Sequence, residues 1–540
     1  MKDISSTGSF IDFTLENFIY VDKTEYIPKL VKLKRVFISR PRRFGKSLTL
    51  DTIATLFETG VEPYFKGTWI YDKWTEPTYP VLRLNFLDLD KYSLEHFKQK
   101  LNAIISSFAR DINVKNYEEK VEPEDTIYFL LDELRKEKRQ IVILIDEYDC
   151  QMTANINNET LYKQFQEKIK SFYATIKNKW PIKFLGITGV TRLKDVEIFS
   201  IGSDIRDITN ASAYSQMIGF TRDEIKKYYI DYLKLASSYE NNCNVDEVTD
   251  DNLESLLDRL AQNYDGYCFD EDYEKKVFST WSVNTFLQSV VDKKKVQFGE
   301  YWYDNGGLPS ILVNYLKTHE LNIFEYLDKD KFLKVSSDDF KNPTALTTIN
   351  QNVLMCQTGY LTLRSDLNKT STVALGIPNG EIYKALNRLL ANNIFKGNTD
   401  ITDDYGRSLL EVGTVDDIIN LFNSALNSVS YDNYPIVSES SVQNMLKLYL
   451  LGAHQKVLSE VHEAKGRADL VVNTDNRRIV FEFKYAKNET EAKTKLSEAV
   501  EQIKTRDYGN ILPKKAELIR IAAVFNADPK VRAFTEFQLV

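Results

Sequence analysis

The chain has 540 residues, of which 43% are hydrophobic and 27% are charged, and its formal net charge is −8 at pH 7. These proportions are those of globular proteins, and at roughly 150 residues per domain the length predicts about three domains. The negative net charge excludes a generally basic, DNA-coating protein, although a local basic groove stays compatible with it.

A short apolar strand is predicted over residues 35–39, and a phosphate-binding signature follows it. The signature reads Arg40-Pro41-Arg42-Arg43-Phe44-Gly45-Lys46-Ser47 and leads into a helical segment that begins at Leu48. A strand, a Gly-Lys-Ser loop and a helix form a P-loop, in which backbone N–H groups and the helix N-terminus hold phosphate. We expect Lys46 to reach the β- and γ-phosphates of ATP and Ser47 to bind Mg²⁺. The predicted nucleotide contacts are Arg43, Phe44, Gly45, Lys46, Ser47 and Leu48.

One position departs from the general P-loop motif. The first glycine of that motif falls where this chain has Arg40. Because this residue opens the loop, we expect the replacement to change the bend of the loop without removing the phosphate cradle.

A second apolar strand is predicted over residues 140–145, and it ends in Asp146 and Glu147. This is the Walker B pattern, so we expect Asp146 on the Mg²⁺ shell and Glu147 beside the attacking water. A buried parallel strand alone explains the apolar run but not the two acids. A third strand is predicted over residues 183–190, and its exit is where related ATPases sense the γ-phosphate. The candidates for that role are Thr188, Thr191 and Arg192.

The pattern then turns helical. Thr221 is a predicted N-cap, with Glu224 three residues later at the spacing of a capping box. Residues 225–262 and 308–395 show apolar residues at intervals of three and four, which indicates amphipathic helices.

Two loops in this region are rich in aromatic residues and glycine, at residues 263–267 and 301–307. Aromatic side chains beside glycines either stack nucleic-acid bases, as in single-strand binders, or pack helix ends together. We expect the packing role, because it is the commoner one.

A predicted hairpin near the C-terminus carries the most informative chemistry. Two β-branched and aromatic runs flank a polar turn. If Asp475-Asn476 form the two-residue loop, antiparallel pairing places Asp469 directly opposite Glu482. Opposed residues have Cβ atoms roughly 4.5–5.5 Å apart, and two like charges there call for a cation such as Mg²⁺. Lys484 follows two residues later and projects from the same face.

This arrangement resembles the PD-(D/E)XK nuclease superfamily. The resemblance implies that Asp469 and Glu482 hold the metal and that Lys484 positions or activates the attacking water. A helix predicted over residues 489–506 and a strand predicted over residues 519–525 extend the resemblance beyond the hairpin. The alternative is a surface hairpin whose charges face solvent, because acids and lysines that alternate with apolar residues are ordinary in edge strands.

A further metal ligand is implied by the same resemblance, since a glutamate on the first helix of these nucleases can join the metal shell. Glu439, which begins a predicted helix over residues 440–451, and Glu460 are the two candidates. The sequence does not choose between them, and we include Glu439 among the predicted metal ligands.

Most of the chain resembles a family of AAA-ATPase-like proteins that couple a P-loop domain to a C-terminal PD-(D/E)XK domain. In that family the Arg-Pro-Arg-Arg-Phe lead into Gly-Lys-Ser is normal, so Arg40 is no obstacle. The segments that carry this resemblance are 10–13, 20–24, 39–47, 145–149, 188–192, 198–200, 264–267, 281–283 and 357–360.

We therefore expect an α/β protein in three parts. These are an AAA-like P-loop ATPase domain over residues 1–215, a helical lid or linker over residues 216–430, and a nuclease-like domain over residues 431–540. The expected activity is Mg²⁺-dependent hydrolysis of phosphodiesters in nucleic acid, gated by ATP. The alternative is a nucleotide-dependent switch or scaffold whose nuclease-like domain does not cut.

Partners and location follow from the same features. DNA is favoured over RNA as the substrate, and a homo-oligomer is compatible with an ATPase that takes an arginine from a neighbour. No apolar run approaches the roughly 20 residues that span a bilayer, and no signal peptide precedes the first strand. Four scattered cysteines fit a reducing compartment. We expect a cytoplasmic protein without membrane contact.

Overall fold

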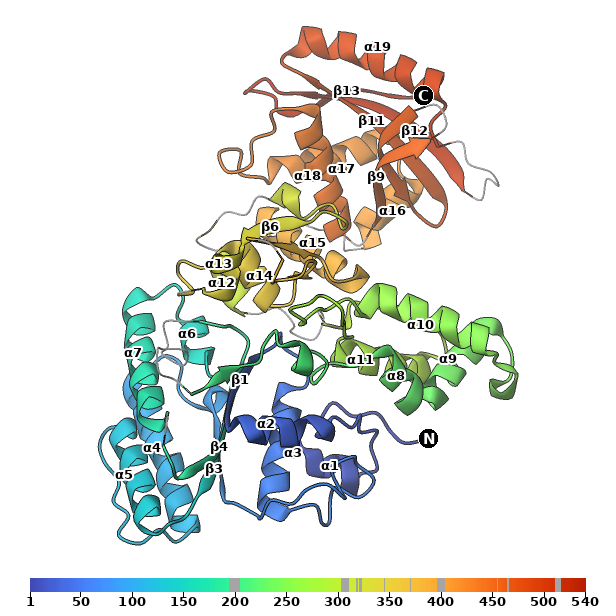
Figure 1. Cartoon of the computed structure of the whole chain (residues 1–540). Coiled ribbons are helices and arrows are strands. Elements are labelled where there is room, and N and C mark those ends of the chain that lie inside the picture. The colour runs from blue at the N-terminus through green and yellow to red at the C-terminus, as the bar shows by residue number, and fades with distance from the viewer. Residues whose placement is uncertain are drawn as a thin grey trace. The chain divides into compact units, whose positions relative to one another are not determined.

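The computed structural model divides the chain into two compact units, which are described separately (Figure 1). The first unit contains Met1–His319 and Phe332–Ile382, and the second contains Glu320–Lys331 and Tyr383–Val540. The residues that the structure describes are 1–177, 179–193, 204–302, 310–316, 319, 323–343, 345–369, 371–395, 404–453, 455–463, 466–509 and 516–540.

The first unit is built on a five-stranded parallel sheet with the strand order β2-β3-β4-β1-β5. The central strands are apolar on both faces because helices cover both sides, as is usual for parallel sheets. The strands are β1 (Arg35–Ser39), β2 (Val81–Asn85), β3 (Ile141–Asp146), β4 (Ile182–Gly189) and β5 (Arg206–Asp207).

Helices α4, α5 and α7 lie on one side of this sheet, and α2 and α3 lie on the other (Figure 1). The helices of this part are α1 (Phe10–Leu15), α2 (Ile27–Leu33), α3 (Lys46–Thr59), α4 (Leu94–Asp111), α5 (Pro123–Lys136), α6 (Cys150–Ala154) and α7 (Glu159–Ile176). Strand β4 separates β1, which leads into the Gly-Lys-Ser loop, from β3, which ends in Asp146. Since all of these strands run parallel, their carboxyl ends meet at one edge of the sheet.

A helical region follows, with its own apolar core between α8, α9, α10 and α11. The capping box predicted at Thr221 is confirmed, because its side chain accepts from the backbone N–H of Glu224 while Glu224 accepts from that of Thr221. The helices are α8 (Arg222–Tyr228), α9 (Ile230–Asn241), α10 (Asp250–Tyr264), α11 (Thr280–Lys293), α12 (Ser310–Leu316), α13 (Ser337–Lys341) and α14 (Gln351–Gln357).

One part of this region differs from the helices predicted over residues 308–395. A small antiparallel sheet with the order β6-β8-β7 lies among the helices. Its strands are too short to show a clear period-two pattern, and the helical spacing on either side masks them. They are β6 (Leu333–Ser336), β7 (Thr362–Leu363) and β8 (Thr372–Gly376).

The second unit contains a five-stranded mixed sheet with the order β13-β12-β11-β10-β9. Only β11 and β12 pair in parallel, and α19 is the crossover between them. Helix α19 covers one side of the sheet, and α17 and α18 lie on the other (Figure 1). The strands are β9 (Lys456–Glu463), β10 (Gly466–Asn473), β11 (Arg477–Ala486), β12 (Glu517–Asn526) and β13 (Ala533–Leu539). The helices are α15 (Gly380–Ile394), α16 (Asp404–Val412), α17 (Val415–Asn427), α18 (Glu439–Gly452) and α19 (Glu489–Arg506). Among the helices that the structure describes, none combines the length and the apolar composition needed to cross a membrane.

Candidate nucleotide and nuclease sites

The P-loop joins β1 to α3. Gly45 has φ 101°, a left-handed conformation that glycine adopts without strain, and Lys46 begins the helix. The Lys46 side chain is 4% exposed, and the contacts of its Nζ with the described residues are long, 3.3 Å to the carbonyl oxygen of Pro41 and 3.4 Å to Glu147 Oε1. A buried lysine held this loosely at a helix N-terminus fits a phosphate group.

Asp146 brings the other predicted phosphate-site residues together. Ser47 Oγ donates to Asp146 Oδ2 over 2.5 Å, and the Thr188 hydroxyl donates to Asp146 Oδ1. Glu147 follows with φ 51°, and its backbone N–H also donates to Asp146. A hydroxyl and a carboxylate that face each other beside the phosphate cradle fit a hexacoordinate Mg²⁺ ion.

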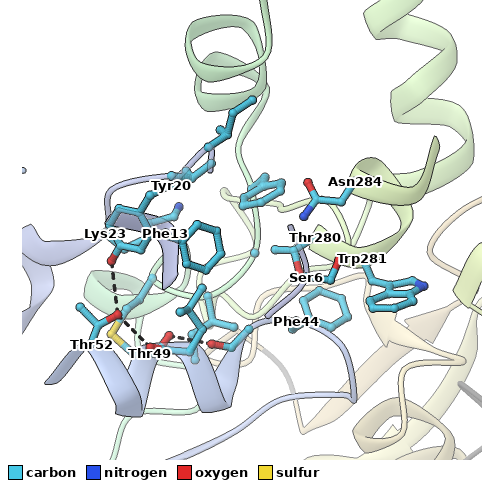
Figure 2. A pocket seen from close by; sticks show the side chains of 18 of the residues that line it. Ser6, Phe13, Tyr20, Lys23, Phe44, Thr49, Thr52, Thr280, Trp281 and Asn284 are labelled. Carbon is cyan, nitrogen blue, oxygen red and sulfur yellow. Dashed lines mark hydrogen bonds between the residues drawn. The ribbon is translucent and has the colours of Figure 1, made fainter. Parts of the chain in front are cut away.

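A large pocket opens beside the P-loop (Figure 2). Its cavity volume is about 160 Å³, and its wall is mostly apolar. Its aromatic side chains include Phe13, Tyr20, Phe44 and Trp281. Four separate segments contribute lining residues, around 5–7, 19–30, 43–52 and 217–220, and Thr280, Trp281 and Asn284 of α11 complete the wall.

Several side chains from distant parts of the first unit hold the P-loop. The Trp302 indole N–H donates to the carbonyl oxygen of Arg42 over 3.3 Å, and Thr280 Oγ1 donates to that of Arg43 over 3.0 Å. Gly359 has φ +94°, and a Cβ there would come within 2.9 Å of Pro41 Cβ.

Phe44 itself is buried against the rings of Tyr267 and Phe269, at centroid distances of 4.7 and 5.6 Å. The aromatic residues of 263–267 are therefore packing residues, as predicted, and so is Trp302, which is 0% exposed. Residues 303–307 of the second aromatic loop lie outside the described residues.

The residues predicted to sense the γ-phosphate occupy different surroundings. Thr188 contacts Asp146, whereas Thr191 donates to Asp149 through both its backbone N–H and its hydroxyl. Burial, followed by the charge of Glu147, raises the pKa of Asp149. The Arg192 guanidinium pairs with Asp207 of β5. A role of Arg192 toward ATP stays a prediction.

In the second unit, the turn at Asp475-Asn476 sets the register of the hairpin between β10 and β11. Leu470 pairs with Phe481, so the same register carries Asp469 opposite Glu482. The predicted register of the hairpin is confirmed.

Burial governs the electrostatics of this acid pair. Glu482 is 0% exposed and Asp469 is 8% exposed. Burial and then the charge of Asp469 raise the pKa of Glu482 to about 7. Burial also raises the pKa of Asp469, although the backbone N–H of Phe483, which donates to Asp469 Oδ2 over 2.8 Å, opposes the shift. Glu482 Oε2 is buried and has no hydrogen-bond partner among the described residues.

Lys484 lies on the same face as Glu482, as the alternation along the strand predicts. Its Nζ donates to Glu482 Oε1 over 2.7 Å and lies 3.4 Å from Oε1 of Glu439, the first residue of α18. Burial lowers the pKa of Lys484, but the hydrogen bond and charge of Glu482 outweigh it, so the pKa is raised. Of the two glutamates left open by the sequence, the structure places Glu439 beside the lysine, while the side chain of Glu460 lies outside the described part.

Gln443 is a neighbour of the acid pair that the sequence did not single out. A hydrogen bond from its side chain lowers the pKa of Asp469. It lies four residues after Glu439 on α18, so both project from one face of that helix. The spacing of four residues after Glu439 is the sequence signal that could have identified Gln443.

The acid pair fits a divalent cation. Asp469 Oδ1 and Glu482 Oε2 belong to two opposed carboxylates, and an unpartnered buried carboxylate oxygen calls for a ligand. Mg²⁺ is held by one or two carboxylates together with water and substrate phosphate, so two acids suffice. Within the described residues, no group of three or more His, Cys, Asp or Glu side chains is arranged around a common metal position.

Comparisons with known proteins give results for both ends of the chain. A family model described as a predicted AAA-ATPase matches residues 5–199, and a model of the PD-(D/E)XK nuclease superfamily matches residues 437–535. An uncharacterised protein from the vnfD 5′ region of Azotobacter chroococcum mcd 1 is 26% identical over 533 residues, which cover 95% of this chain and 94% of that protein.

Among solved structures, Cdc6p from Pyrobaculum aerophilum is similar at 11% identity and a TM-score of 0.25, over 68% of this chain and 93% of that one. The Aeropyrum pernix ORC1 protein, solved in complex with DNA, is similar at 10% identity and a TM-score of 0.28, over 69% of this chain and 95% of that one. At TM-scores this low the two structures support no argument about this protein. The two family matches are informative. They show that the chain combines an AAA-ATPase-like domain over residues 5–199 with a PD-(D/E)XK nuclease superfamily domain over residues 437–535.

Proposed function

We propose that this protein binds and hydrolyses ATP and that its C-terminal domain, gated by ATP, cleaves phosphodiesters in nucleic acid with a bound Mg²⁺ ion, DNA being the favoured substrate. The observation that carries the proposal is the buried pair of Asp469 and Glu482, with Glu482 Oε2 unpartnered and Lys484 alongside. We retain residues 431–540 as the nuclease-like domain, residues 1–215 as the ATPase domain and residues 216–430 as the region between them.

Each residue of the acid site has a distinct part in the proposed reaction. Asp469 and Glu482 would hold the ion, which supplies Lewis-acid polarisation of the scissile phosphate and a more acidic bound water. Lys484, held by Glu482 and Glu439, would orient the attacking water or offset negative charge that develops on the phosphate. Gln443 would fix the orientation of the Asp469 carboxylate.

At the other end of the chain, the P-loop and the pocket of Figure 2 support binding of a whole nucleotide. The phosphates would lie on the backbone of residues 43–47, with Lys46 as counter-charge and Ser47 and Asp146 on Mg²⁺. The pocket is continuous with this loop, and its mostly apolar lining with a few polar groups is typical of small-molecule sites. The base and ribose would occupy it, and Glu147 would orient the water that attacks the γ-phosphate.

Asp469→Asn tests the nuclease directly, because the substitution keeps the shape of the side chain and removes its charge. We expect it to abolish Mg²⁺-dependent cleavage of DNA while ATP hydrolysis stays at the wild-type rate. Asp475→Asn, in the exposed turn of the same hairpin, is the matched control and should cut normally. Cleavage that persists undiminished in Asp469→Asn would remove the acid pair from the mechanism.

A second candidate function is a nucleotide-dependent switch or scaffold that does not cut. The observation in its favour is that Lys484 pairs with one oxygen of Glu482 over 2.7 Å, so a side chain of the protein itself offsets part of the acidic charge. The two candidates differ in metal binding. A cutting site should show Mg²⁺- or Mn²⁺-dependent thermal stabilisation that Asp469→Asn loses, whereas a retired site should show none.

A further inference from the structure

An arginine beside the acid pair has no part in the roles assigned so far. Arg506 is the last residue of α19, and its side chain is exposed. Its Nη1 donates to the hydroxyl of Tyr508 over 2.8 Å, and the Gln502 side chain lies 3.3 Å from the same hydroxyl. Tyr508 is 0% exposed. A buried tyrosine, whose hydroxyl is also bonded by a glutamine of α19, therefore holds one edge of the guanidinium in place.

Gly466, the first residue of β10, gives the arginine room to cross the strand. A Cβ at this position would lie 2.5 Å from Arg506 Cδ and 3.2 Å from Tyr508 Cε1. The arginine side chain thus runs directly over the backbone of Gly466, three residues before Asp469. A side chain larger than hydrogen at this position would displace it.

The charge of Arg506 is close enough to the acid pair to interact with it. The hydrogen bond and charge of Tyr508 raise the pKa of Arg506, and Glu482 and Asp469 add to the shift. Yet among the described residues no carboxylate forms an ion pair with Arg506, and the Tyr508 hydroxyl is the single acceptor that it contacts. Most of its five N–H donors are therefore directed to solvent.

We propose that Arg506 binds a phosphate of the nucleic-acid backbone next to the scissile bond and so positions the strand over Asp469 and Glu482. This inference rests on the proposed nuclease function. A planar guanidinium binds a phosphate with two parallel hydrogen bonds, which fixes orientation as well as affinity. The competing role is structural, a cation that stabilises the C-terminus of α19. That role involves no contact with the nucleic acid.

Binding measured against salt concentration separates the two roles. The variants are Arg506→Gln, Arg506→Lys and, as a matched loss of one charge in the same helical turn, Lys504→Gln. Lys504 is also exposed, and two residues along a helix turn it roughly 200° away from Arg506. The probes are a fluorescently labelled single-stranded DNA and an RNA of the same sequence, with ATP and Ca²⁺ in place of Mg²⁺ for binding and with ATP and Mg²⁺ for cleavage.

We expect Arg506→Gln to weaken binding about tenfold and to reduce the slope of log Kd against log salt by about 0.7, the value for one lost phosphate contact on a single strand. Arg506→Lys should keep the salt slope but raise KM, because the charge remains and the bidentate geometry is lost. Lys504→Gln should match the wild type. If Arg506→Gln matches the wild type in affinity, slope and cleavage while the wild type binds and cuts, the inference is wrong and the proposed function stands. If the wild type neither binds nor cuts either probe, both are overturned.

Discussion

The carboxyl group of Glu482 is the buried acid on which the electrostatics of the acid pair depend. It lies at the centre of a five-stranded sheet, fully buried, with Asp469 opposite and one oxygen unpartnered within the described residues. Taking an ionised carboxylate out of water is costly unless it is paired, and its usual response is a raised pKa. The geometry that would hold a cation is therefore the geometry that makes the metal-free site unstable at neutral pH.

The pH dependence of stability tests this conclusion. Burial and Asp469 raise the pKa of Glu482 from 4.5 to about 7, so between these values the folded protein keeps a proton that the unfolded chain has released. The folded state is then favoured at low pH, and this contribution to stability is lost as the pH rises through about 7. In EDTA, we expect the unfolding temperature of the wild type to fall between about pH 5 and about pH 8, relative to that of Glu482→Gln.

The glutamine variant is the control, because it is neutral throughout and shares every other titrating group. Mg²⁺ should reverse the trend in the wild type, since metal and proton compete for the same oxygen. Parallel pH profiles for the two proteins in EDTA would show that Glu482 is not perturbed.

At the scale of elements, regular local patterns were enough for several predictions. Alternation and a two-residue polar turn predicted the hairpin register, because a shift of one residue would turn the buried side chains to the opposite face. The helix predicted over residues 489–506 is α19, and the strand predicted over residues 519–525 lies within β12. The apolar runs that end in Gly-Lys-Ser and Asp-Glu are β1 and β3 of the parallel sheet.

Contacts between distant segments could not be predicted in this way. Trp302 and Gly359 reach the P-loop across about 260 and 318 residues of chain, and nothing in their local sequence indicates where they pack. Arg506 escaped notice because a basic residue at the end of a helix is ordinary. The path of its side chain depends on Gly466, which lies in strand β10 and not in the same helix. Short strands such as β7, with two residues, were also lost within a helical pattern.

The support that α11 gives the P-loop leads to a prediction at this scale. Thr280→Val keeps the size of the side chain but removes the hydroxyl that donates to the carbonyl oxygen of Arg43. A partly buried hydrogen bond of this kind contributes about 0.5–1.5 kcal/mol, so ATP should bind roughly two- to tenfold more weakly. Titration with a fluorescent ATP analogue measures the effect. Ser289→Ala, which removes a hydroxyl of the same helix that bonds Phe286 and Tyr301, should leave the affinity unchanged.

At the scale of the whole molecule, the chain joins two units that each have their own sheet and core. Coupling between the two units is the remaining element of the proposed function. If ATP gates cleavage, a protein unable to bind nucleotide should lose the effect of ATP while keeping an intact acid pair.

The most direct test is a cleavage assay on circular single-stranded and supercoiled DNA with Mg²⁺ or Mn²⁺, with and without ATP. It compares the wild type, Asp469→Asn and Lys46→Ala, with Lys66→Ala as the control for loss of an exposed lysine. We predict that the wild type cuts in an ATP-dependent manner, that Asp469→Asn does not cut, and that Lys46→Ala no longer responds to ATP. Absence of cutting by the wild type on DNA and on RNA, with ATP hydrolysis intact, would contradict the nuclease assignment and favour the switch or scaffold.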